Sequence, residues 1–299
     1  MNILQITQQA YRELGLVAPA ALVTSADPAV IQFLAIAGRI GRDLVKEFEW
    51  QVLVKESLIT TLVTTTTGTT ALNSAVITGI PSTAGFTTNY GVAGVGVLPF
   101  SQIASIDNGT QITMNQVATA SGTVTLSFGQ VNYPLPADWG RQIPQTEWDR
   151  TNRWPLNGPK SSQEWQNFKS GIVYAGPRLR FRIAGGSIQL NPVPSASGRL
   201  SMEYISKGWC VSTAGVGSEF ILADTDSPIF DDNLVVAAIK LRWLQSKGLD
   251  FGYAMDDYRG TLEKLKSQDK SAPKLSLSQG NGSILMSTAN IQDGNFPSG

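Results

Sequence analysis

The sequence contains no histidine and only one cysteine among its 299 residues. Histidine is the commonest general base and the commonest metal ligand, so its absence argues against most hydrolase mechanisms. A single cysteine, Cys210, excludes an intramolecular disulfide and a cysteine metal cluster. Its neighbours Trp209 and Val211 are apolar, which predicts a small buried side chain at this position. We therefore expect no enzyme activity, no cofactor and no metal site.

Charged residues are also scarce, at 15% of the chain against about 25% in typical soluble domains. The 23 basic residues balance the 23 acidic residues, so no overall positive field attracts phosphate backbones. A dedicated nucleic-acid binder is not expected. Uncharged polar residues cover part of the surface, and protein partners can cover the rest, which favours a subunit of an assembly.

Long apolar runs are absent as well. No segment approaches the roughly 18 apolar residues that a membrane-spanning helix needs. The first residues, MNILQITQQAYREL, lack the basic start and the unbroken apolar run of an export signal. We therefore expect no membrane anchor.

The letters Asp-Phe-Gly, which bind magnesium in protein kinases, occur at residues 250–252. The chain lacks the Gly-rich phosphate loop and the catalytic Asp with its Asn partner that this chemistry requires. Helical spacing explains the segment better: Lys247 and Gly248 end one helix, and Asp250 accepts N–H groups at the start of the next. The predicted apolar stripe of this last helix consists of Phe251, Ala254, Tyr258, Leu262 and Leu265.

Three further helix starts are predicted from capping residues. Asn2 precedes an amphipathic segment that ends at Gly15, and Asp27 precedes Pro28 and a longer segment up to about residue 48. Glycines 38 and 41 lie inside this second helix, which suggests that another backbone approaches it closely. In the stretch DSPIFDDNLVVAAIKLRWLQSKG, Ser227 is expected to cap a third long helix. This helix and the last one would form an antiparallel hairpin.

Residues 63–130 have a different pattern, rich in Gly, Thr and Ser. Between Gly68 and Gly129 the only charged side chain is Asp107. Short apolar runs such as TQITMN and SGTVTLSFG are separated by turn residues, and no helical periodicity is present. The pattern predicts a small inserted β module. Further strands are expected in LRFRI and GSIQLNPVP, joined by an Ala-Gly-Gly turn, and in GRLSMEYIS.

Four of the seven tryptophans fall within 27 residues of a proline-rich, turn-rich segment: Trp139, Trp148, Trp154 and Trp165. They either pack on the domain core or anchor a protein interface, where Trp is enriched. A second candidate group alternates with apolar residues in GPRLRFRIAGG and comprises Arg178, Arg180 and Arg182. This spacing fits the solvated polar face of a strand, or a ring of arginines in an oligomer.

After Lys274 the chain is polar and rich in Gly and Ser, which predicts an arm that becomes ordered on a partner. Its apolar residues are candidate contacts: Ile284, Leu285, Met286 and Phe296. The expected fold class is α+β, with a helical bundle core, a small β-sheet, an inserted β module and an extended C-terminal arm. The predicted segments are 1–62 and 131–273 for the core, 63–130 for the inserted module and 274–299 for the arm.

Three features together resemble a known family: the N-terminal helix pair ending in LVKEFEW, the central YPLPADW followed by EWDRT, and the C-terminal helix hairpin. On these features the chain resembles the head-to-tail adaptor proteins of short-tailed bacteriophages, the group that includes tail tubular protein A. The inserted module departs from the shorter members of that family. None of the three features is a catalytic signature.

The resemblance implies a structural virion protein that forms a twelve-fold ring at the head-to-tail junction. Such a ring would bind the portal protein on one side and the tail nozzle or tube on the other. It would continue the channel through which genomic DNA passes during ejection, without specific DNA binding. The C-terminal arm would dock on the portal or on a neighbouring subunit.

Three alternatives remain at this stage. A role as a tail nozzle or tube subunit is close to the adaptor hypothesis, although such subunits are expected to be mainly β. A glycan-binding or receptor-binding tail protein would use the β module and the tryptophans as a binding platform. An enzyme that cleaves glycans would pair Glu147 with Asp149, although two carboxylates at this spacing do not by themselves predict a cleft.

Overall fold

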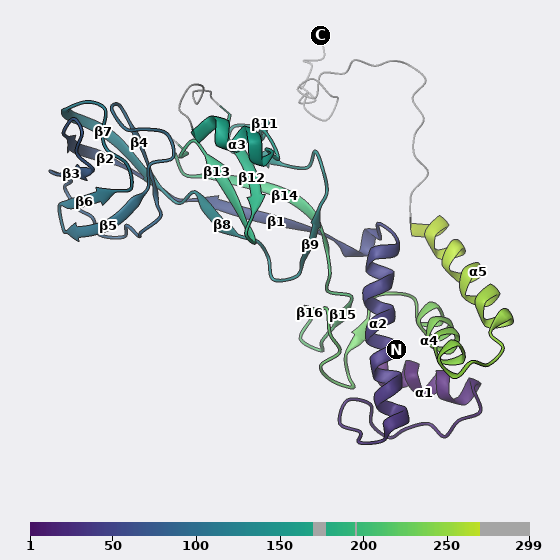
Figure 1. The fold of residues 1–299 in the computed structure, drawn as a ribbon. Helices are drawn as coiled ribbons and strands as arrows, with labels where there is room; N and C mark the ends of the chain where they lie inside the picture. The colour runs from purple at the N-terminus through teal and green to yellow at the C-terminus, as the bar shows by residue number, and fades with distance from the viewer. Residues whose placement is uncertain (170–177, 195, 270–299) are drawn as a thin grey trace, which may run out of the picture. The chain divides into compact units, whose positions relative to one another are not determined.

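The structure, a computed structural model, describes residues 1–169, 178–194 and 196–269. These residues form an α+β fold with five α-helices and several small antiparallel sheets (Figure 1). The chain divides into two compact units. The helical unit consists of Met1–Val54 and Ile205–Gly299, and the strand unit consists of Lys55–Tyr204.

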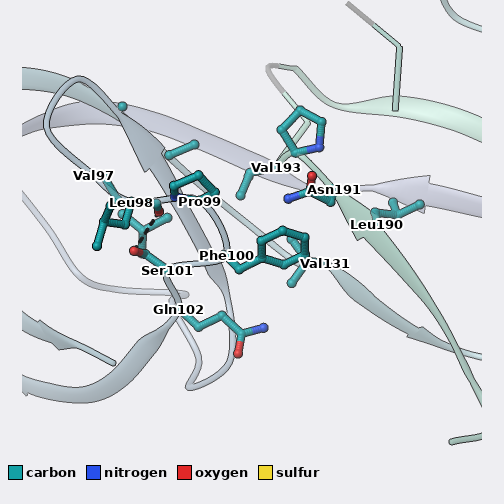
Figure 2. A pocket seen from close by; sticks show the side chains of 15 residues that line it. Val97, Leu98, Pro99, Phe100, Ser101, Gln102, Val131, Leu190, Asn191 and Val193 are labelled. Carbon is teal, nitrogen blue, oxygen red and sulfur yellow. Dashed lines mark hydrogen bonds between the residues drawn. The ribbon is translucent and has the colours of Figure 1, made fainter. Parts of the chain in front are cut away.

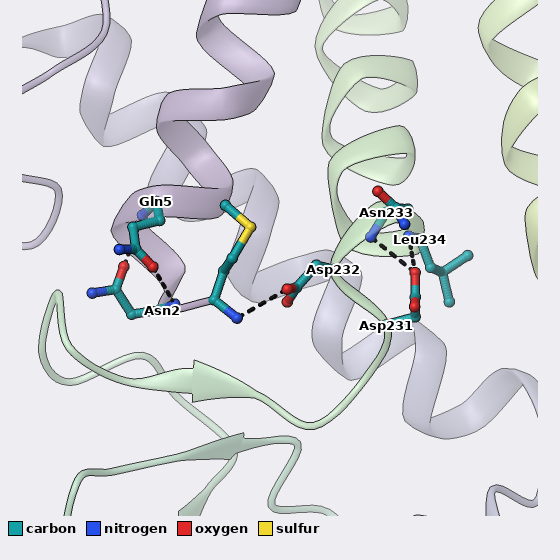
Figure 3. A network of polar contacts seen from close by, with 7 residues as sticks. Asn2, Gln5, Asp231, Asp232, Asn233 and Leu234 are labelled. Atoms are coloured by element: carbon teal, nitrogen blue, oxygen red, sulfur yellow. Dashed lines mark hydrogen bonds and ion pairs between the residues drawn. The ribbon is translucent and has the colours of Figure 1, made fainter.

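The first two helices of the helical unit begin where their capping residues predict. Helix α1 (Ile3–Glu13) starts after Asn2, whose side chain accepts from the Gln5 backbone N–H while the Gln5 side chain accepts from the Asn2 N–H (Figure 3). Helix α2 (Pro28–Glu47) starts after Asp27, whose carboxylate accepts from the Ala29 N–H at 2.8 Å. Both N-cap predictions are confirmed, because local chemistry alone satisfies these N–H groups.

Helix α4 (Asp232–Lys247) lies between α2 and α5 (Gly252–Asp269) and also packs against α1 (Figure 1). It is buried over most of its first ten residues rather than along one stripe: Leu234, Val235, Val236, Ala237, Ala238, Ile239 and Leu241. The α4–α5 hairpin is therefore present as predicted. Gly248 ends α4 with a positive φ of 66°, the left-handed conformation that glycine adopts without strain.

The predicted start of α4 is wrong. Ser227 does not cap the helix, because Ser227–Pro228 form strand β17, in which Pro228 pairs with Cys210. The cap is Asp231, whose carboxylate accepts from the Asn233 and Leu234 N–H groups at 2.9 and 3.3 Å (Figure 3).

The rest of the helical unit is a short 3-10 helix, η1 (Gln51–Leu53), and a small sheet. That sheet has the order β16 (Gly217–Ser218), β15 (Cys210–Val211), β17. Trp209, fully buried, precedes β15 and lies against Gly41 of α2, where an added Cβ would be 2.0 Å from Cε2 of the indole ring. The predicted close approach to α2 exists at Gly41, but a side chain makes it rather than a backbone.

Two sheets of the strand unit lie outside residues 63–130, and the larger one contains Trp139, Trp148 and Trp154. In the larger sheet, β1 (Val54–Thr61), β14 (Gly198–Ser206), β10 (Trp148–Asp149) and β11 (Trp154–Pro155) lie in this order, and β9 (Trp139–Gln142) also pairs with β14. The second sheet has the order β12 (Arg180–Ala184), β13 (Ser187–Asn191), β8 (Asn132–Pro134). The predicted turn between β12 and β13 is confirmed, with positive φ at Gly185 and Gly186.

Residues 63–130 contain strands and no helix, as the pattern predicts. One sheet has the order β2 (Val63–Thr70), β7 (Gly122–Gly129), β4 (Gly91–Gly94), and the other β3 (Val76–Ile77), β6 (Gln111–Met114), β5 (Ile103–Asn108). A separate hydrophobic cluster lies between them, with Ile77, Ile112, Leu126 and Phe128 fully buried. The predicted boundaries of the four segments remain predictions.

Candidate interaction surface around the tryptophan-rich segment

The four clustered tryptophans differ in burial. Trp165 is 3% exposed, whereas Trp139, Trp148 and Trp154 are half-buried. Trp165 lies on α3 (Ser162–Lys169), and its ring meets the Phe100 ring edge-on, with 5.3 Å between the ring centroids. The interpretation that the tryptophans pack on the core therefore holds fully for Trp165, while the other three keep part of the indole accessible.

Trp139 is held in place by stacking. Its ring lies 4.7 Å from the Tyr204 ring at an interplanar angle of 20°. The Tyr204 hydroxyl donates to Asp138 at 2.9 Å, and Lys55 forms an ion pair with the same carboxylate at 2.7 Å. Burial and the neighbouring Asp138 raise the pKa of Tyr204 to about 12, so the hydroxyl stays a donor. This contact network fixes the orientation of the half-exposed Trp139 ring.

Trp148 and Trp154 lie on the paired strands β10 and β11, where Trp148 faces Pro155 and Asp149 faces Trp154. The Nε1 atom of Trp154 is buried and has no hydrogen-bond partner among the described residues. Asp149 is buried and accepts from the backbone N–H groups of Thr151 and Asn152, which fixes the turn between the two strands. Its carboxylate is thus engaged in a turn.

Glu147, the other carboxylate of the glycan-cleavage alternative, is 4% exposed. It lies immediately before β10, and its backbone carbonyl accepts from the Leu156 N–H at 3.1 Å. Its Oε1 has no partner among the described residues, and burial raises the pKa of its carboxyl. Asp149 is therefore held in the turn between β10 and β11, and Glu147 is buried just before the same strand pair.

The three candidate arginines do not form one solvated face. Arg180, 8% exposed, places its guanidinium 4.3 Å from the centroid of the Phe168 ring on α3. Arg182 donates to the Ser162 hydroxyl at 3.3 Å. Arg178 precedes β12 and is exposed. The prediction of a solvated strand face is wrong for Arg180, because α3 covers this face of β12 and a guanidinium packs favourably over an aromatic ring.

The candidate residues of the arm, Ile284, Leu285, Met286 and Phe296, lie outside the described residues. Instead, the structure reveals an exposed apolar group that the sequence patterns missed. Leu249 and Phe251 lie between α4 and α5, and Tyr253 lies in the first turn of α5; these three residues, here called the hairpin tip, are 48%, 40% and 85% exposed. Phe251 was expected in the apolar stripe of α5, but it precedes the helix, and only Ala254 and Leu262 of that stripe are buried. The sequence does contain a signal for this group: three apolar residues at alternate positions, 249, 251 and 253, next to the glycine that ends α4.

Chemically reactive groups are few in the described part of the chain. Cys210 is buried as predicted, and burial together with the nearby Asp226 raises its pKa to about 12. Within residues 1–169, 178–194 and 196–269, no group of three His, Cys, Asp or Glu side chains could hold a metal ion. None of the helices described there is both long and apolar enough to cross a membrane.

Comparison with known families gives a match over residues 101–275 to the model described as SU10 adaptor protein. The matched region is more than half of the 299 residues and includes the tryptophan-rich segment, β12 to β14 and the α4–α5 hairpin. The helices α1 and α2 precede it. No curated protein matches the chain.

Proposed function

Because the chain belongs to the SU10 adaptor protein family, a family of phage structural adaptors, we propose that it forms the ring that connects the portal to the tail. The family match is the observation that carries this proposal. A structural adaptor role is non-enzymatic in character. The carboxylates considered for glycan cleavage agree with this role, because Asp149 accepts hydrogen bonds within a turn and Glu147 is buried.

The finer proposal is an adaptor like tail tubular protein A of short-tailed phages, with twelve copies around the DNA channel at the head-to-tail junction. In this proposal α1, α2, α4 and α5 form the helical bundle, which the packing of α4 against the other three supports. The equal numbers of basic and acidic residues suit a channel wall that lets DNA pass without holding it.

Contacts in the ring are proposed for the accessible apolar and aromatic groups. The hairpin tip and the half-buried Trp139, Trp148 and Trp154 have the composition of interface anchors. Arg178 is the candidate arginine that remains exposed, whereas Arg180 and Arg182 support α3. Trp165 is proposed to stabilise the subunit rather than to contact a partner.

The mass of the assembly tests the adaptor role. Native mass spectrometry would be recorded on the full chain alone and after mixing with the portal protein of the same phage. The proposal predicts a discrete ring bound to the portal. A chain that ignores the portal but assembles on the tail nozzle or binds surface glycans would contradict it.

The arm, residues 274–299, is proposed to dock on the portal or on a neighbouring subunit. Deleting it is expected to weaken portal binding while the circular dichroism spectrum and the unfolding midpoint stay unchanged. A matched control replaces the same residues with a Gly/Ser sequence of equal length, which separates the loss of side chains from the loss of chain. Portal binding unaffected by both changes would contradict this role.

A further inference from the structure

The helical unit carries a second exposed apolar group in addition to the hairpin tip. Three side chains just before and after β16, here called the loop group, are 65%, 57% and 69% exposed: Val216, Phe220 and Leu222. The backbone of this segment is fixed, because the indole N–H of the buried Trp209 donates to the Glu219 carbonyl at 2.8 Å. The buried Asp226 carboxylate also accepts from the Leu222 N–H at 2.8 Å. The loop group is therefore an apolar surface that buried residues hold in place.

The hairpin tip and the loop group lie at different ends and on different sides of α2. Lys247, which ends α4 just before the hairpin tip, donates to Gln32 near the start of α2 at 2.9 Å. Arg42, near the other end of α2, lies 5.7 Å from the centroid of the Phe220 ring. From position 32 to position 42 a helix advances about 15 Å and turns by about 280°. In Figure 1, α4 and α5 accordingly lie on one side of α2, and β15 and β16 lie on the other. The two groups are thus separate surfaces of the same unit.

The charges beside the two groups are complementary. Asp256 and Asp257 follow Tyr253 by three and four residues, so they lie on the same face of α5, and both are exposed. No basic residue occurs between Gly248 and Tyr258. Arg42, beside the loop group, is a cation, and within the described residues no ion pair joins it to a carboxylate. Neither Asp256 nor Asp257 has an ion pair with a described residue either. The hairpin tip therefore presents free negative charge, and the loop group presents free positive charge.

These charges select the partner of each surface. A contact between two hairpin tips would bring Asp256 and Asp257 of both copies together, and repulsion between like charges opposes it. A contact between a hairpin tip and a loop group covers apolar side chains on both surfaces and brings opposite charges together. By contrast, the pocket of the strand unit between residues 91–102 and the end of β13 has an apolar lining without a charged side chain among the described residues (Figure 2). Two unlike surfaces that fit each other produce a head-to-tail contact, which closes into a ring when the rotation between copies allows it.

We propose that the hairpin tip of one copy of this chain binds the loop group of the next copy, with Asp256 and Asp257 placed beside Arg42. The inference rests on the proposed ring function and specifies which two surfaces join neighbouring subunits. Each copy contacts one neighbour through its hairpin tip and the other neighbour through its loop group. The apolar side chains form the centre of the contact, and the opposite charges at its rim set the orientation.

Disulfide formation between copies of the full chain tests the contact. Tyr253→Cys and Leu222→Cys replace exposed side chains, and the native Cys210 does not interfere because it is buried. With oxidised glutathione, a mixture of the two single variants should give covalent dimers, and a chain with both substitutions should give a ladder of covalent multimers. Each single variant alone should stay uncrosslinked. Covalent dimers of Tyr253→Cys alone would show that two hairpin tips meet, which would overturn the proposal.

Charge reversal tests the rim of the contact. Arg42→Glu should weaken association of the full chain about tenfold, and so should the combined Asp256→Lys and Asp257→Lys substitutions, because like charges then meet. Combining all three substitutions should restore association to within about threefold of the natural chain. Lys264→Glu, at an exposed position of α5, is the matched control and should have no effect. Analytical ultracentrifugation over a range of protein concentrations measures association. A triple variant that associates no better than Arg42→Glu would contradict the pairing of these charges.

Native mass spectrometry of the crosslinking samples, recorded with and without the portal protein, separates this inference from the proposed function. A ring bound to the portal without crosslinks between positions 222 and 253 would overturn the contact and leave the adaptor role in place. Crosslinked multimers that do not bind the portal would support the contact and contradict the adaptor role. Absence of crosslinks in both samples would overturn the contact. Thermal unfolding of each variant verifies that it is folded.

Discussion

At the scale of single residues, the two glycines of α2 have opposite roles. At Gly41 the buried Trp209 ring occupies the place of a side chain, whereas a Cβ on Gly38 would lie 3.5 Å from Arg42, an ordinary contact. Sequence periodicity places both glycines in a helix but does not distinguish them, because Trp209 is far away in the sequence.

Gly41→Ala is expected to destabilise the helical unit by about 1–3 kcal/mol or more, because the fully buried indole has no room to move. Gly38→Ala is the matched control and should stabilise it by up to about 1 kcal/mol through helix propensity. Urea unfolding followed by far-ultraviolet circular dichroism measures both. Equal effects of the two substitutions would contradict the close approach of Trp209.

The buried carboxyl of Glu147 predicts that the free energy of unfolding depends on pH. Burial raises the pKa of its carboxyl in the folded state, so the folded chain holds this proton more tightly than the unfolded chain. The free energy of unfolding therefore decreases as pH rises from about 4.3, the ordinary value, to the raised pKa, and stays lower above it. Glu147→Gln should remove this decrease, so its unfolding midpoint exceeds that of the natural chain more at pH 8 than at pH 4.

The exposed Glu203 on β14 provides the control for this experiment. Glu203→Gln should leave the difference between pH 4 and pH 8 unchanged. If Glu147→Gln behaves in the same way, the Glu147 carboxyl is not desolvated in the folded chain. The sequence did not reveal this burial, because it depends on pairing of β10 with β14, some fifty residues away.

At the scale of elements, helix starts were predictable where the cap and the first turn are local. Asn2 and Asp27 satisfy the first N–H groups of their own helices. The predicted cap at Ser227 was wrong because its neighbour Pro228 pairs with Cys210, a contact that no local sequence pattern indicates. The strands of residues 63–130 were recognisable from short apolar runs and turn residues, but their pairing order was not.

Asp231→Ala is expected to destabilise the first turn of α4 by about 1 kcal/mol, because the N–H groups of Asn233 and Leu234 lose their acceptor. Ser227→Ala, at the position that the sequence favoured, should have a much smaller effect on this turn. Hydrogen exchange of the Asn233 and Leu234 amides distinguishes the two substitutions. If these amides exchange faster in Ser227→Ala but not in Asp231→Ala, Ser227 and not Asp231 caps the helix.

At the scale of the whole molecule, the family membership and the exposed apolar groups lead to an assembly prediction. The triple substitution of Leu249, Phe251 and Tyr253 by Ser should leave the fold intact, because all three side chains are exposed. It should weaken ring formation on the portal about tenfold or more if the hairpin tip anchors a contact.

The double substitution of Glu263 and Lys264 by Gln, at exposed positions of α5, is the matched control for the hairpin tip. Light scattering of mixtures with the portal gives the assembled fraction for both variants. Assembly of the triple variant at the same protein concentration as the natural chain would show that the hairpin tip stays free in the ring.

The pairing of β2 with β7 has a consequence for how this chain can be altered. The pair begins at Val63↔Gly129, so the chain enters and leaves residues 63–129 through neighbouring strands. Two chain ends that lie side by side can be joined by a tight turn or connected to any foreign domain whose own termini are adjacent. We therefore expect residues 64–128 to be the place where a fluorescent reporter can be inserted without interrupting β1 or β8.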